Sequence, residues 1–275
     1  MARLGALRDA TTIVGGVTLA FAEWGVPDGR VVVGWPGNPG ARFGLGWARE
    51  WAAECGVRLI IFDRPGMGGS EPDPSRTVTS TARRVTRAVA GLGITQFAVL
   101  GNSSGGPYAL ACAAVAPAAV TRVAIVAGVG VMGEAGAHDG MSEENDRFWS
   151  QASVAPSATT ETFQRIIGDA LAKGLHPEKV ADIEEAGRQG AFNLALDAHV
   201  ITARWDVELA DVTAPVDLWH GAVDDDVPLI QAQRLADRLR HATLHVWPNR
   251  GHDMPPGAML EVYALLGCEP TSPTS

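Results

Sequence analysis

The chain has 275 residues, of which 46% are hydrophobic, and a formal net charge of −9 at pH 7. This length and apolar content suffice to bury the core of one large α/β domain, whereas an acidic chain without a long basic run is a poor partner for nucleic acid. The three cysteines are widely spaced, so we expect reduced thiols, no metal and a cytoplasmic protein. No apolar run is long enough to span a bilayer and no signal region follows Met1, so we expect no contact with membranes.

The amino-terminal part of the chain alternates short β-rich runs with turns and helical patterns. Gly15-Gly16 between two β-rich runs predicts a hairpin, and Trp47 and Trp51, four residues apart, predict a helix that packs on the sheet. The patterns together predict strands at 11–14, 17–24, 31–33, 57–62 and 97–100, and helices at 43–55, 78–92 and 109–116.

A strand, a tight turn and a helix meet at residues 101–106, Gly-Asn-Ser-Ser-Gly-Gly. Glycines allow the close backbone approach that such a turn requires, and the helix N-terminus that follows favours negative charge. The pattern Gly-x-Ser-x-Gly in this setting predicts a nucleophile elbow with Ser103 at its apex. Ser104 is a poorer candidate for the nucleophile, because its frame would put Asn102 where the elbow needs glycine.

From residue 129 to 205 the alternation of strands and helices stops. The segment contains helical patterns around 143–151, 160–173, 177–189 and 192–205, and no β-rich run separates them. It is too long for one crossover connection, so we interpret it as a helical cap inserted between two strands. Its aromatic side chains could line an apolar pocket or pack between cap helices; the candidates for the pocket are Trp149, Phe163 and Trp205.

The alternation returns after residue 205. Strands are predicted at 216–220 and 243–247, helices at 229–239 and 259–266, and a disordered tail at 269–275. The chain therefore divides into an α/β core, made of 1–128 and 206–268, and a cap at 129–205. Strands that alternate with helices predict a mostly parallel sheet covered on both faces. Function in such sheets gathers at the carboxyl ends of the strands.

A serine nucleophile needs a general base and a carboxylate that orients the base, and the elbow expects the chain order Ser, Asp, His. His252 lies in a glycine loop just past a strand, as a base should, and His220 at a strand end is the second choice. Asp224 is the favoured acid, since it lies four residues before the proline that starts the next helix. Asp225 and Asp226 are expected to be solvated or to cap that helix.

Three clustered aspartates at 224–226 could instead bind a divalent cation, although their spacing does not resemble a calcium loop. The tetrahedral intermediate of acyl transfer needs two amide donors. One is expected from Ser104, the residue after the nucleophile. The other is expected from the loop at 35–40, where Pro36 and Pro39 have no N–H; Asn38 is the best-placed donor there, with Gly37 next.

These motifs resemble the α/β-hydrolase superfamily over residues 12–266. The matching stretches are the elbow, Asp-Arg-Pro-Gly-Met-Gly-Gly-Ser at 63–70, Trp-His-Gly-Ala-Val-Asp-Asp-Asp-Val-Pro at 219–228 and Gly-His at 251–252. The resemblance implies an α/β-hydrolase fold, with a mostly parallel eight-stranded sheet, helices on both faces and an inserted helical cap. One departure is Pro36, which stands where the family often has a histidine that braces the oxyanion loop.

The resemblance implies a cofactor-free serine hydrolase that acts on an ester or related acyl small molecule through Ser103, His252 and Asp224. The amides of Asn38 and Ser104 would form the oxyanion hole. A complete triad is also compatible with a carbon–carbon bond hydrolase or with a non-hydrolytic lyase, cyclase or cofactor-free oxygenase of this fold. A non-catalytic ligand-binding protein is a further alternative. The sequence leaves the substrate and the oligomeric state open.

Overall fold

The computed structural model describes residues 7–170, 172, 174–203, 205–254 and 257–266. These residues form one eight-stranded sheet in the order β1-β2-β4-β3-β5-β6-β7-β8. Only β2 runs against its neighbours within the described sheet, so the predicted mostly parallel sheet is confirmed. The strands are β1 (Arg8–Val14), β2 (Val17–Gly25), β3 (Arg30–Trp35), β4 (Val57–Phe62), β5 (Phe97–Asn102), β6 (Val120–Val126), β7 (Val216–Gly221) and β8 (Ala242–Trp247).

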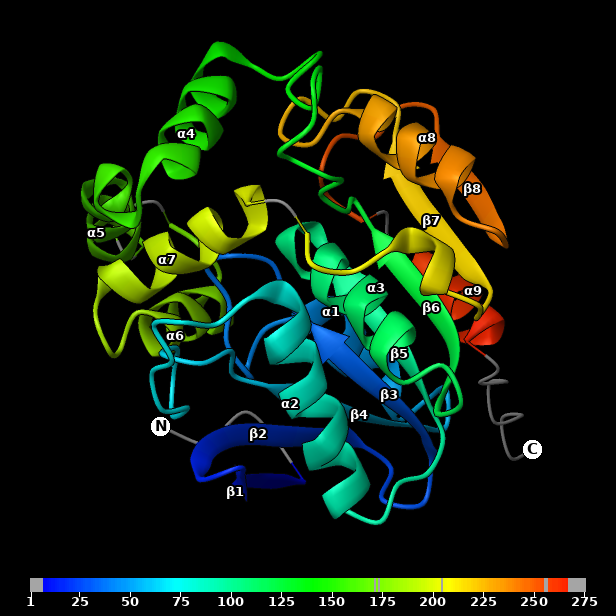
Figure 1. Cartoon of the computed structure of the whole chain (residues 1–275). Helices are drawn as coiled ribbons and strands as arrows, with labels where there is room; N and C mark the ends of the chain where they lie inside the picture. The colour runs from blue at the N-terminus through cyan, green and yellow to red at the C-terminus, as the bar shows by residue number, and fades with distance from the viewer. Residues whose placement is uncertain (1–6, 171, 173, 204, 255–256, 267–275) are drawn as a thin grey trace.

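Helices cover both faces of the sheet (Figure 1). Alternate residues of the central strands enter opposite cores: Val33 packs with the helices of one face and Val32 with those of the other. This is why the inner strands are continuous apolar runs in the sequence. One face carries α2 (Val78–Gly91), α3 (Gly106–Val115) and α8 (Leu229–Arg238), and the other carries α1 (Gly46–Ala52) and α9 (Ala258–Leu265).

Within the described residues, four α-helices lie between β6 and β7, and Figure 1 shows them gathered beyond one end of the sheet. They are α4 (Glu143–Val154), α5 (Thr160–Asp169), α6 (Pro177–Ala186) and α7 (Ala191–Thr202). All four were expected from the sequence, although α5, α6 and α7 end earlier than predicted. We call residues 129–205 the cap segment, and the exact division between core and cap stays a prediction.

The structure differs from the sequence pattern before β4. The helical spacing extends over 43–55, but α1 covers only Gly46–Ala52. Leu45, immediately before the helix, has a positive φ of 56°, a left-handed conformation that cannot continue a right-handed helix. The helix therefore begins after Leu45, and Phe43 belongs to the preceding loop.

Cys55 and Cys112 are buried and form no disulfide with another described residue. Cys268 and the tail 269–275, which we expected to be disordered, lie outside the described residues. In the part of the chain that the structure covers, no helix combines the length and the apolar character needed to cross a membrane.

Candidate active site

Ser103 stands at the turn between β5 and α3. The strand ends at Asn102, a single 3-10 turn covers Ser103–Gly105, and α3 begins at Gly106. Ser103 has a φ of 50°, which is costly for a residue with a side chain and typical of functional sites. A Cβ on Gly105 would overlap the carbonyl oxygen of Trp35, so only glycine fits there. This is the backbone geometry of a nucleophile elbow.

Asp224 and His252 meet across two loops that follow neighbouring strands. His252 follows β8, and its Nδ1 lies 2.9 Å from Oδ2 of Asp224, which follows β7. The other carboxylate oxygen of Asp224 accepts hydrogen bonds from the amides of Asp226 (3.0 Å) and Val227 (2.8 Å). Asp224 is thus held from both sides, and its bond to Nδ1 leaves Nε2 of His252 as the nitrogen that can accept a proton.

Asp224 and His252 shift each other's pKa. Burial alone would raise the pKa of Asp224, but hydrogen bonds from His220, His252 and the Val227 amide outweigh burial and hold it well below its ordinary value. Burial alone would lower the pKa of His252, but the hydrogen bond and negative charge of Asp224 outweigh burial and raise it. The pair therefore favours an ionised carboxylate beside an imidazole that readily accepts a proton.

The other candidates in this region have structural contacts. His220 is buried, and its Nε2 donates to the carbonyl oxygen of Val227 at 2.6 Å, which fixes the loop after β7. Asp225 and Asp226 are exposed, as expected for solvated residues. They hold the start of α4, because the Asp225 carbonyl accepts from the Ser142 amide and Asp226 Oδ1 accepts from Asn145 Nδ2.

The loop after β3 lies directly against Ser103. A Cβ on Gly37 would lie only 3.2 Å from Cβ of Ser103, so the backbone of this loop lies close beside the serine. Asn38 lines the same cleft as Ser103, and its N–H makes no hydrogen bond with the described residues. Ser104 lies in the first turn that follows β5, where amides have no partner of their own within a helix. Both predicted oxyanion donors therefore lie beside Ser103.

Arg64 holds this loop in place of the missing histidine. Its guanidinium is almost fully buried and donates to the carbonyl oxygens of Pro36 (2.7 Å) and Gly37 (3.1 Å). In the sequence, Arg64 is part of the motif at 63–70, and that motif predicted no role for it. Only the fold brings the loops after β3 and β4 together, because these strands are neighbours in the sheet.

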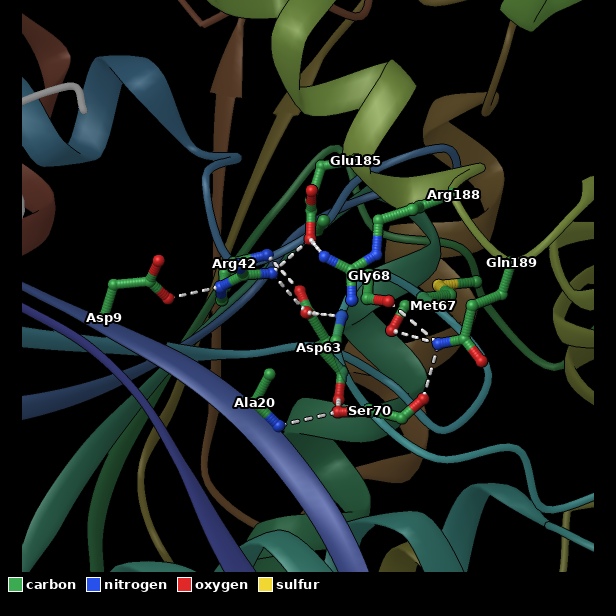
Figure 2. Close-up of polar contacts among 12 residues, drawn as sticks. Asp9, Ala20, Arg42, Asp63, Met67, Gly68, Ser70, Glu185, Arg188 and Gln189 are labelled. Atoms are coloured by element: carbon green, nitrogen blue, oxygen red, sulfur yellow. Dashed lines mark hydrogen bonds and ion pairs between the residues drawn. The ribbon is translucent and has the colours of Figure 1, made fainter. Parts of the chain in front are cut away.

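Asp63, the residue before Arg64, anchors the neighbouring backbone (Figure 2). Its carboxylate accepts from the amides of Arg42 (2.6 Å) and Gly69 (2.8 Å) and from the Arg42 guanidinium (2.7 Å). Burial raises the pKa of Asp63 to about 6, although these partners oppose the shift. The contacts hold the motif at 63–70 against Arg42, in the loop after β3.

Two polar side chains near the carboxyl end of α6 attach the cap segment to this motif and to Arg42, which binds it. Glu185 Oε1 accepts from the Arg42 guanidinium at 2.6 Å, and Gln189 Nε2 donates to the carbonyl oxygens of Gly68 (2.8 Å) and Ser70 (2.7 Å). Figure 2 shows Gln189 reaching the loop that starts at Asp63 and Glu185 reaching Arg42, which itself binds Asp63. The cap segment is therefore joined by polar contacts to the loops that support the site.

A cleft of about 1360 Å³ joins the site to the cap helices α4 and α5. Ser103, His252 and Asn38 line it together with Trp149 and Phe163, two of the predicted pocket residues. The third, Trp205, is not among the described lining residues; it packs in the main core and donates its indole N–H to the Ile201 carbonyl at 3.2 Å. The charged side chains that line the cleft are Glu143, Glu144, Arg147, Glu161, Arg165 and Asp226.

Ser103 and His252 line the same cleft, but the described residues include no hydrogen bond between the Ser103 hydroxyl and the imidazole. Nucleophile–base hydrogen bonds are often long in the absence of substrate and shorten when substrate binds. The arrangement thus brings together a strained serine, a histidine paired with a carboxylate and a loop with a free amide. These are the parts required for acyl transfer.

The sequence matches that of known hydrolases. The profile of the alpha/beta hydrolase family matches residues 24–265. A 2-hydroxy-6-oxo-6-phenylhexa-2,4-dienoate hydrolase from Burkholderia cepacia is 30% identical over 235 residues, which cover 78% of each chain. A protein named as a carbamate hydrolase in Variovorax paradoxus is 31% identical over 210 residues, 72% of this chain and 76% of that protein.

Solved structures with low sequence identity share the fold. An esterase from Exiguobacterium antarcticum superposes with a TM-score of 0.72 at 19% identity, covering 94% of this chain and 98% of the esterase. At this identity the likeness concerns the fold alone. The family match over most of the chain and the 30% identity to the Burkholderia enzyme establish that the chain belongs to the alpha/beta hydrolase family.

Proposed function

We propose that this chain is a serine hydrolase that acts on an ester or a related acyl small molecule. Ser103 is the nucleophile, His252 the general base and acid, and Asp224 the carboxylate that orients the imidazole. The amides of Asn38 and Ser104 stabilise the oxyanion. The observation that carries this proposal is the 2.9 Å hydrogen bond between His252 and Asp224 at the cleft that Ser103 also lines.

In this mechanism the Ser103 hydroxyl attacks the substrate carbonyl while Nε2 of His252 takes its proton. The carbonyl oxygen becomes negative in the tetrahedral intermediate and receives hydrogen bonds from the Asn38 and Ser104 amides. The protonated imidazole then gives its proton to the leaving alcohol, and an acyl-Ser103 intermediate remains. Water, deprotonated by His252, attacks this ester and releases the acid, which restores the serine hydroxyl.

A carbon–carbon bond hydrolase is the second candidate. The Burkholderia relative is named for a substrate with a ketone and a carboxylate, and cleavage beside the ketone releases an acid as ester hydrolysis does. Arg147 and Arg165 line the cleft, and neither forms an ion pair with another described residue. Either guanidinium could bind a substrate carboxylate, although three glutamates line the same cleft.

The test of the proposal is covalent labelling. A fluorophosphonate probe should label the wild-type protein at Ser103, and Ser103→Ala should abolish labelling and turnover without loss of the fold. Ser104→Ala is the matched control, because it removes the neighbouring hydroxyl and keeps the backbone amide. Labelling that persists in Ser103→Ala would exclude Ser103 as the nucleophile.

A substrate panel separates the two candidates. The wild-type protein is assayed with p-nitrophenyl esters of increasing acyl length and, in parallel, with a 2-hydroxy-6-oxo-dienoate whose loss is followed by absorbance. Turnover of esters alone supports the first candidate, and a kcat/KM higher by orders of magnitude for the dienoate supports the second. A protein that turns over neither substrate and resists the probe contradicts both hydrolase candidates.

A further inference from the structure

Asp197 is a fully buried carboxylate on the cap helix α7, far in sequence from the predicted triad. A buried carboxylate is costly unless its oxygens are paired and hydrogen-bonded. Asp197 Oδ1 accepts from the Tyr108 hydroxyl at 2.7 Å and lies 3.2 Å from Nε of Arg64. Its Oδ2 accepts from Nδ2 of Asn38 at 3.2 Å. Both oxygens therefore have partners.

These partners come from the segments that form the proposed machinery. Tyr108 belongs to α3, the helix that begins immediately after the elbow. Arg64 holds the carbonyl oxygens of Pro36 and Gly37, and Asn38 carries the proposed oxyanion amide. One cap carboxylate thus contacts the helix after the nucleophile, the oxyanion loop and the arginine that supports that loop.

The side chain of Asn38 is fixed to α7 in one orientation. Its Nδ2 donates to the Leu194 carbonyl at 2.9 Å as well as to Asp197, so both hydrogen atoms of the amide are used. A rotated amide would place its oxygen against the Leu194 carbonyl. Both hydrogen atoms of Nδ2 are held by residues of α7. The direction of the Asn38 backbone N–H therefore depends on where α7 lies.

We propose that Asp197 is a positioning residue that sets the geometry of the oxyanion hole from the cap. This inference rests on the proposed function, in which the Asn38 amide stabilises the oxyanion. Asp197 does not touch the substrate. It acts through Asn38 and Arg64, and consequently the oxyanion hole is complete only when α7 is packed on the core.

The first test is the steady-state kinetics of Asp197→Asn. Asparagine has the size of aspartate but offers one oxygen where Asp197 offers two, so it cannot satisfy Asn38, Arg64 and Tyr108 together. We expect kcat for a p-nitrophenyl ester to fall by about 10- to 100-fold, with KM changed less than threefold, because misplaced donors weaken mainly the transition state.

Asp182→Asn is the matched control. Asp182 is also a buried cap carboxylate and accepts from the amide of Ala41, but it contacts neither Asn38 nor Arg64. We expect its kcat and KM to stay within twofold of the wild type. If Asp182→Asn lowers kcat as much as Asp197→Asn, Asp197 acts only through general docking of the cap, and the proposal is overturned.

A double-mutant cycle identifies the route. Asn38→Ala keeps the backbone amide and removes only the side-chain link to α7. If Asp197 acts through Asn38, the double variant Asn38→Ala/Asp197→Asn should lose little more than the worse single variant. Tyr108→Phe, which removes only the hydroxyl contact, should cost less than Asp197→Asn. Fully additive losses for Asn38 and Asp197 would contradict the route.

A measurement without turnover separates this inference from the proposed function. Backbone ¹⁵N relaxation reports the order of the Gly37 and Asn38 amides on the picosecond to nanosecond timescale. Their order parameters should fall in Asp197→Asn and stay unchanged in Asp182→Asn. If the wild-type protein fails to hydrolyse esters or react with the probe, the proposed function fails, while relaxation still decides whether Asp197 holds the loop. Unchanged order at Gly37 and Asn38 overturns the inference, whatever the activity.

Discussion

Nδ1 of His252 donates to Oδ2 of Asp224 at 2.9 Å, and the second oxygen of the same carboxylate is occupied by the Asp226 and Val227 amides. The carboxylate therefore cannot rotate away from the imidazole without losing backbone hydrogen bonds. This relationship fixes the tautomer of the histidine and gives a specific expectation for the pH dependence of the reaction.

The rate should rise with pH through the raised pKa of His252, because only the neutral imidazole can take the serine proton. Asp224→Asn should lower kcat by about 10⁴-fold, since the imidazole loses its orienting carboxylate. It should also move the acidic limb of the kcat/KM profile to lower pH, because the charge that raised the pKa is gone. Profiles of both proteins between pH 5 and 9 measure the two effects.

Asp226→Asn is the control for that loop. Like Asp224→Asn, this variant removes one carboxylate charge beside the cleft. The Asp226 side chain does not bind Asp224, which accepts only the Asp226 backbone amide. Its effect on kcat should stay within about threefold. A large loss in Asp226→Asn with a small one in Asp224→Asn would show that the acid has been misassigned.

The stability of the protein should depend on the charge of Asp182. Burial raises its pKa from 3.8 to about 7, although Lys179, Arg49 and the Ala41 amide oppose the shift. The stability that this group contributes is fully present below pH 3.8 and is lost as pH rises through about 7. Asparagine keeps the acceptor for Ala41 without the charge, so Asp182→Asn should raise the free energy of unfolding at pH 8 by on the order of 1 kcal/mol or more.

Urea unfolding of wild-type protein and Asp182→Asn at pH 5.5 and pH 8 measures this effect. The advantage of the variant should shrink as the pH falls, because the wild-type carboxyl becomes protonated and resembles the amide. An equal difference at both pH values would mean that Asp182 titrates near its ordinary pKa in the folded state.

Gly105→Ala should damage the elbow. The added Cβ would overlap the carbonyl oxygen of Trp35, a backbone atom that cannot move without disturbing β3. We expect a loss of roughly 1–3 kcal/mol or more in the free energy of unfolding. Gly91→Ala is the control, since a Cβ there meets no atom within 4 Å at the end of α2. It should leave stability unchanged or raise it by up to about 1 kcal/mol.

The two cleft arginines give a prediction on substrate charge. If a substrate carboxylate binds Arg147 or Arg165, replacing that arginine by glutamine should raise KM for the dienoate by about tenfold or more. KM for a neutral p-nitrophenyl ester should stay the same, because the ester carries no charge to pair. Equal changes for both substrates would mean that the arginine shapes the cleft without pairing with charge.

The sequence predicted the elements that depend on interactions between residues close together in the chain. The elbow at Ser103 and the hairpin at Gly15-Gly16 each follow from a short pattern, and the mostly parallel sheet follows from the alternation of strands and helices. The structure contains all three. Helix α1 is shorter than its apolar spacing predicts, because Leu45 adopts a left-handed conformation that the spacing does not reveal.

The supporting contacts of the site could not be predicted in this way. The interactions of Arg64 with the oxyanion loop and with Asp197 join segments that are distant in the sequence, and no periodicity encodes such pairs. Trp205 illustrates the same limit, since an aromatic residue in the cap segment can pack in the core or line the cleft. The structure shows that Trp205 packs in the core, where its indole N–H donates to the Ile201 carbonyl.

The contacts between Gln189 and the backbone of the motif at 63–70 bear on how this chain can be recombined with its relatives. A chimera with crossovers after β6 and before β7 would exchange Gln189 and Glu185 while keeping their partners, the loop at 63–70 for Gln189 and Arg42 for Glu185. The foreign cap would then need side chains of the same reach and polarity at those positions. Cap exchange in this family should therefore succeed most often when the donor loop at 63–70 is transferred together with the cap.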